Sequence, residues 1–132
     1  MGKHISESLF STYLVMSSDD DAPIVRDVVV GFNRDKQITV CIDHCDYEQK
    51  EYNCSTGFVV NREDGFKLAR KLKVRYSELP YYIAVFMKEW REIINPTLYQ
   101  AKECFCEIYD NFLAEDCRLK MIYSYGKGGY QC

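Results

Sequence analysis

Three cysteines and one of the two histidines of this chain fall within the fourteen residues CIDHCDYEQKEYNC, 41–54. Thiolate and imidazole groups are the ligands that zinc prefers, so a metal site is the first chemistry to consider. The strand predicted over 37–45 separates Cys41 from Cys45 by about 13 Å, which is too far for one ion. His44 points to the opposite face of that strand, which leaves only Cys45 and Cys54 within reach of each other. We therefore predict no metal and no cofactor.

The seven cysteines are an odd number, and the sequence starts without a signal-peptide pattern. Reduced thiols in a cytoplasmic protein are the expectation from this cysteine usage, although Cys45 and Cys54 could pair on oxidation. The carboxylates of Asp43 and Asp46 would raise the pKa of a neighbouring thiol, so a reactive cysteine is not expected there. No apolar run approaches the roughly 20 residues of a membrane span, so no membrane contact is expected.

Catalytic motifs are absent from the sequence. The chain has two histidines and no phosphate-binding loop, nucleophile elbow, dinucleotide fingerprint or metalloprotease helix. We expect no catalytic residues and a protein that is not an enzyme.

The length of 132 residues indicates one domain, 1–132, and a net charge of −3 gives no general attraction to nucleic acid. Polar residues at 17–23 predict a connector, and the glycine-rich end at 126–132 predicts a flexible tail. Alternating or continuous apolar runs predict strands over 24–32, 37–45, 55–60 and 117–125. Residues 5–16 are compatible with either a helix or a strand.

Strand register is predicted from the turn NRDK, 33–36, taken as a four-residue loop. Phe32 then faces Gln37, and Val28 faces Cys41. One face of the sheet would carry Val28, Val30, Phe32, Cys41, Phe58 and Val60, and the other Val29, Ile38, Val40 and Ile42. Two apolar faces and an open edge also allow self-association, so a homodimer is a further expectation.

The second half of the sequence has helical periodicity. Asn61 is a candidate N-cap, with Phe66, Ala69 and Leu72 as the buried stripe. A second helix is predicted over 78–94, and a third begins after Asn95–Pro96. The core positions expected on these two helices are Leu79, Ile83, Phe86, Trp90, Ile93 or Ile94, Leu98, Ala101, Phe105, Ile108 and Phe112. The predicted fold class is α+β: an N-terminal antiparallel meander of three to five strands packed against about three helices.

The loop between the second and third strands is acidic and carries two tyrosines. A small, acidic, tyrosine-rich protein without catalytic motifs has the profile of a dedicated inhibitor, as in bacterial immunity proteins, antitoxins and phage anti-defence proteins. Acidic loops can occupy the basic site of another protein and speed association with it. We predict partner binding by loop 43–53, assisted by Asp19–Asp21. The residues expected to make the contact are Asp43, Asp46, Tyr47, Glu48, Glu51 and Tyr52.

The alternative is a nucleic-acid binder that uses Arg70, Lys71, Lys73 and Arg75. LARKLKVRYSELPYYI, 68–83, resembles a helix-turn-helix, although Lys73 stands where the turn usually has glycine and Pro80 interrupts the second helix.

A second resemblance spans roughly 28–72. The residues VVVGFNRDKQITVCID and STGFVVNREDGFKLARKL resemble the single-stranded-DNA-binding transcription coactivators of the positive-cofactor type. The resemblance implies a sheet followed by a helix, and binding of single strands. Two features depart from that family: Gly65 stands where a tryptophan is typical, and the hairpin is acidic rather than basic.

Overall fold

The computed structural model describes residues 12–16, 24–46, 48, 54–93, 95–114 and 117–124. The predicted connector 17–23 and tail 126–132 lie outside them, as do residues 5–11 of the ambiguous segment. The strands are β1 (Tyr13–Met16), β2 (Ile24–Phe32), β3 (Ile38–Asp46), β4 (Cys54–Val60) and β5 (Leu119–Ser124). The helices are α2 (Arg62–Leu72), α3 (Leu79–Phe86) and α4 (Leu98–Ile108), with short turns η2 (Tyr76–Glu78), η3 (Lys88–Glu92) and η4 (Tyr109–Leu113).

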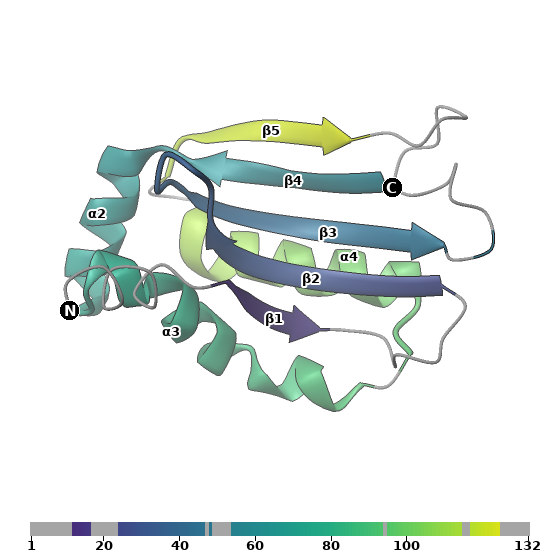
Figure 1. Ribbon diagram of the computed structural model, residues 1–132. Coiled ribbons are helices and arrows are strands. Elements are labelled where there is room, and N and C mark those ends of the chain that lie inside the picture. The colour runs from purple at the N-terminus through teal and green to yellow at the C-terminus, as the bar shows by residue number, and fades with distance from the viewer. Residues whose placement is uncertain are drawn as a thin grey trace, which may run out of the picture.

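The five strands form one sheet in the order β1-β2-β3-β4-β5, and every neighbouring pair is antiparallel. Helix α4 lies behind this sheet and α2 stands at one end of it (Figure 1). The predicted α+β class is thus confirmed, and β2 has the predicted bounds. None of the described helices is long and apolar enough to cross a membrane.

The register between β2 and β3 differs by one residue from the prediction. Phe32 lies opposite Ile38, because the loop spans five residues, Asn33–Gln37. The Asn33 side-chain carbonyl accepts hydrogen bonds from the backbone amides of Asp35 (3.0 Å) and Gln37 (2.9 Å), and Lys36 adopts a left-handed φ of 59°. These bonds fix the longer turn. A shift of one residue exchanges the two faces of a strand.

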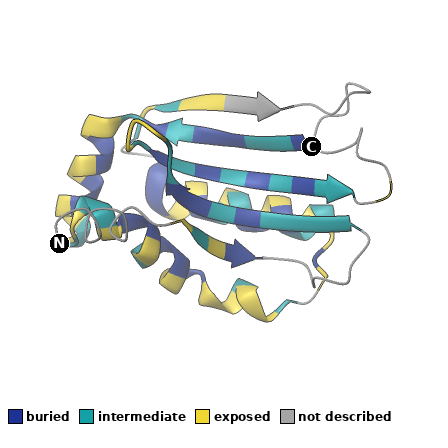
Figure 2. Cartoon of the chain, viewed as in Figure 1, coloured by how far each residue is buried: buried dark blue, intermediate teal, exposed yellow. Residues whose placement is uncertain are grey.

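The exchange of faces affects the assignment of β3. Ile38, Val40 and Ile42 point into the core, while Cys41 points out, so the prediction that Cys41 shares a face with Val28 is wrong. Buried and half-buried residues alternate along β3 (Figure 2). The next hairpin is shifted as well, because Cys54 lies opposite His44 and not Cys45.

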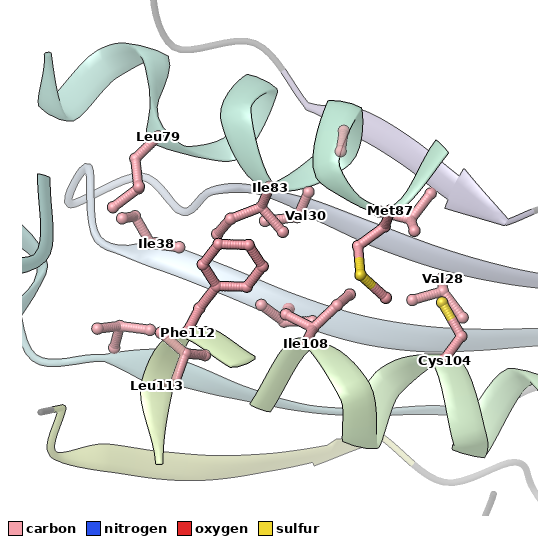
Figure 3. Close-up of a cluster of buried hydrophobic side chains, with 14 of the residues drawn as sticks. Val28, Val30, Ile38, Leu79, Ile83, Met87, Cys104, Ile108, Phe112 and Leu113 are labelled. Atoms are coloured by element: carbon pink, nitrogen blue, oxygen red, sulfur yellow. The ribbon is translucent and has the colours of Figure 1, made fainter. Parts of the chain in front are cut away.

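The core lies between the sheet and the helices (Figure 3). Val28, Val30 and Ile38 of the sheet face the helical layer. The helical residues that meet them are Leu79, Ile83, Met87, Cys104, Ile108, Phe112 and Leu113. All are buried, and each large aliphatic side chain contributes about 1.5–3 kcal/mol to stability.

Helix α2 is capped as predicted. The Asn61 side chain accepts from the backbone amide of Asp64 at 3.4 Å, and Glu63 and Asp64 occupy the first turn. Arg118 fixes this end to β5, because its backbone amide and its Nε both donate to the Asp64 carboxylate, at 2.8 and 2.9 Å. The predicted burial of Ala69 is confirmed, but that of Phe66 is wrong: Phe66 is 43% exposed, and Leu68 is buried instead.

The predicted helix 78–94 is interrupted. Helix α3 ends at Phe86, and the chain continues as the 3-10 turn η3. Met87 takes the buried position predicted for Phe86, which is 57% exposed. Helix α4 begins at a capping box formed by Thr97 and Gln100.

Candidate functional site

The sheet has one face that no described helix covers. Figure 1 shows α4 behind the strands, so the face toward the viewer is the one opposite the helices. Directly opposed residues share a face, so the register defines the side chains that line this surface. We call it the outer face. It carries Leu14, Val25, Asp27, Val29, Thr39, Cys41, Asp43, Cys45, Ser55, Val59 and Lys120, with Gly31 and Gly57 between them.

An apolar row crosses the middle of the outer face. Leu14, Val29, Cys41 and Gly57 lie opposite one another from β1 to β4. Leu14 is 48% exposed, and Val29 and Cys41 are half-buried. A Cβ added at Gly57 would meet the Cys41 Sγ at 2.7 Å, so the thiol already fills the space above this glycine. The row presents a continuous apolar strip to the outside.

An acidic row runs beside the apolar one. Asp27 of β2 lies opposite Asp43 of β3, and Ser55 Oγ donates to the Asp43 carboxylate at 2.7 Å. This pairing brings two carboxylates together on the outer face. At the end of β3, the backbone amide of Glu48 donates to Asp46 Oδ1 at 3.0 Å. Of the predicted contact residues, Asp43 lies on the outer face, whereas Asp46 lies on the side of His44 at the end of β3, and Glu48 follows it.

The remaining predicted contact residues, Tyr47, Glu51 and Tyr52, lie outside the described residues, as does Asp19–Asp21. Sequence analysis missed Asp27, Val29 and Leu14 as members of this surface. Their membership depends on the register, which the turn sequence alone did not give.

The thiols of the outer face are those of Cys41 and Cys45. Burial, and then the nearby Asp43 carboxylate, raise the pKa of Cys41 to about 11, against a smaller opposing effect of the Ser55 hydrogen bond. Cys41 is therefore a neutral thiol at physiological pH. Cys45 is a free thiol and Cys54 is disulfide-bonded, so the two are not partners, and the expectation of reduced thiols throughout is wrong at Cys54. Among the described residues, no group of three or more histidine, cysteine, aspartate or glutamate side chains could hold a metal ion.

His44 lies on the core side of the sheet, opposite Arg26. It is buried, and Arg26 Nη1 donates to the Pro96 carbonyl at 3.3 Å. Burial, and then the Arg26 charge, lower the pKa of His44, while Asp46 acts in the opposite direction. The imidazole is therefore held neutral inside the fold, in a structural position away from the outer face.

Two of the four cations of the nucleic-acid alternative, Arg70 and Lys71, line different hollows. Arg70 shares a hollow of about 460 Å³ with Glu63, Phe66 and Lys67, whereas Lys71 lies beside Leu72 in a separate groove between the helices. Lys73 is the left-handed cap of α2, and Arg75 precedes η2.

Helix α3 would be the recognition helix of a helix-turn-helix. Its exposed large side chains are Tyr81, Val85 and Phe86, and Pro80 is buried. Polar and basic side chains are the ones that reach base edges and phosphates, so this face does not suit a recognition helix.

Comparisons with known proteins give no match to this chain among family models, curated sequences or solved structures.

Proposed function

We propose that this chain is a small non-enzymatic module that binds and inhibits another protein through the outer face of its sheet. The observation that carries the proposal is the apolar row flanked by the Asp27–Asp43 pair on a face that no described helix covers. Specific protein interfaces combine an apolar centre with a polar rim, and this surface has both.

Charge indicates the kind of partner. The acidic row places two carboxylates, Asp27 and Asp43, on the outer face. Asp46 ends β3 on the side of His44, and Glu48 follows it. A complementary positive surface would be drawn to these carboxylates. We therefore propose a partner with a basic site, and proteins that act on nucleic acid are the natural class.

The test is capture of the partner from the native cell by the tagged chain, followed by measurement of the purified pair. Wild type is compared with Asp43→Lys and with a matched charge reversal on α4, Glu103→Lys, whose side chain is exposed on another element. Asp43→Lys should weaken binding at least tenfold, and Glu103→Lys should leave it unchanged. The affinity should also fall as salt rises.

Equal binding by wild type and Asp43→Lys, with both proteins folded by thermal melting, would refute the assignment of this surface. Val29→Lys is a second variant that places a charge in the apolar row. A dimer of the chain alone that Val29→Lys dissociates would make the outer face a self-association surface, and would replace the proposal.

A further inference from the structure

An exposed aromatic ring stands on α2, away from the outer face. Phe66 packs against Tyr76 with ring centroids 4.2 Å apart and planes inclined by 31°. Tyr76 in turn contacts Phe32 of β2 at 5.4 Å, and its hydroxyl donates to the Lys36 carbonyl at 2.7 Å. Phe66 is therefore supported from one side by a chain of contacts reaching the sheet, and yet it remains 43% exposed.

Cations flank this ring on both sides. On one side, Phe66 lines the hollow of about 460 Å³ with Lys67 and Arg70. On the other side, it lines a hollow of about 310 Å³ with Lys36, Arg62, Tyr76 and Ser77. All four cations are exposed.

The two carboxylates in the first turn of α2 both interact with Arg118. Glu63 is the carboxylate that lines the first hollow, and it forms an ion pair with Arg118 at 3.7 Å. Asp64 accepts from the same arginine, whose charge and hydrogen bonds lower the pKa of this carboxyl. The surface around Phe66 is thus positive in a protein whose net charge is −3.

We propose that the Phe66 surface, formed by Lys36, Arg62, Phe66, Lys67 and Arg70 over Tyr76, binds single-stranded nucleic acid. An unpaired base stacks on Phe66, and the phosphates on either side of that base lie in the two cationic hollows. An exposed ring between cations is the arrangement by which proteins bind single strands without sequence preference, since every base has a stacking face. A duplex keeps its bases stacked inside, so it can use the cations but not the ring.

This inference goes beyond the proposed function, because it concerns a second surface and a different class of ligand. It also differs from the prediction from sequence. Of the four cations that the sequence predicted for nucleic-acid binding, only Arg70 belongs to the Phe66 surface. The other three are Lys71, Lys73 and Arg75.

The test uses the full chain and a fluorescent 15-nucleotide oligo-dT, with binding followed by anisotropy. If all four cations contact phosphates, log K should fall with log salt at a slope of about −2.8, or about 50-fold between 50 and 200 mM. Phe66→Leu keeps an apolar contact with Tyr76 and should weaken binding about 5- to 150-fold. Arg70→Gln should reduce the slope by about 0.7.

Two matched controls come from α4. Lys102→Gln removes an exposed cation, and Tyr99→Leu removes a ring that is 76% exposed; both should bind oligo-dT as wild type does. The inference is overturned if wild type fails to bind oligo-dT, if Phe66→Leu and Tyr99→Leu bind equally, or if a duplex of the same length binds as tightly. Capture of a protein that Phe66→Leu abolishes, without oligo-dT binding, would assign this surface to a protein ligand instead. Asp43→Lys should not weaken oligo-dT binding, so this inference and the proposed function can fail separately.

Discussion

The close approach of β3 and β4 at Gly57 can be tested by adding a single methyl group. A Cβ at this position would overlap the Val40 carbonyl oxygen and lie 2.9 Å from the Cys41 Cα. Real Cβ atoms essentially never approach backbone atoms so closely, and backbone atoms cannot rotate away as a side chain can. Gly57→Ala therefore forces β3 and β4 apart in the middle of the outer face.

The expected cost follows from this geometry. Overpacking costs about 1–3 kcal/mol, and we expect the upper end, because β3 is held by ladders to both neighbours. A loss of about 3 kcal/mol corresponds to a fall in Tm of roughly 12 °C for a domain of this size.

Gly65→Ala is the matched control. A Cβ at Gly65 would meet side-chain atoms only, the Tyr76 ring at 2.9 Å and Ile38 Cδ1 at 3.5 Å, so no backbone is pushed apart. Alanine also favours the helix by about 1 kcal/mol over glycine, so Gly65→Ala should stay within about 1 kcal/mol of wild type. Urea unfolding and thermal melting of the three proteins give the comparison. A Gly57→Ala protein as stable as wild type would refute the register that places Gly57 against Cys41.

Two further predictions concern stability and are measured in the same way. The pKa of His44 is below its ordinary 6.5 in the folded protein, so the unfolded chain takes up more protons as the pH falls below 6.5. The free energy of unfolding should therefore decrease as the pH drops below 6.5, and His44 contributes at most about 1.4 kcal/mol per pH unit to this decrease. His44→Gln should make the decrease less steep. An unchanged pH profile in this variant would contradict the lowered pKa of His44. Lys73 has a left-handed φ of 59°, which glycine adopts more readily than lysine. Lys73→Gly should therefore stabilise the protein by about 0.5–1 kcal/mol. A loss of stability would contradict the left-handed cap at Lys73.

The strands were largely predictable because their sequences are distinctive. IVRDVVVGF is rich in β-branched residues and ends in turn residues, and β2 has the predicted bounds. The register was not predictable from composition, because a four-residue and a five-residue loop both fit NRDKQ. The choice depends on the side chain of Asn33, which binds two backbone amides of the longer turn.

The exposure of Phe66 could not be predicted from the sequence for a different reason. Periodicity shows that one side of a helix is apolar, but not how far the partner surface extends. Because α2 stands at the end of the sheet, Leu68 and Ala69 reach the core, while Phe66 remains outside against Tyr76. The end of helix α3 at Phe86 was also not predictable, because no glycine or proline follows it within residues 87–94.

The sequence alone did not indicate which residues share the outer face. The acidic residues of loop 43–53 are visible in the sequence, but strand alternation puts Asp43 and Asp46 on opposite faces of β3. The contribution of Asp27 and Val29 required the pairing of β2 with β3. A surface made by side chains from several strands cannot be found from any one of them.

Two free cysteines allow the central claim to be tested directly. Cys45 belongs to the outer face, whereas Cys106 is exposed on α4, on the other side of the sheet. The rates at which iodoacetamide alkylates the two thiols are measured by mass spectrometry, with and without the captured partner. Partner binding through the outer face should slow alkylation of Cys45 and leave Cys106 unchanged. Protection of Cys106 with Cys45 unaffected would place the partner on the helical side and contradict the account.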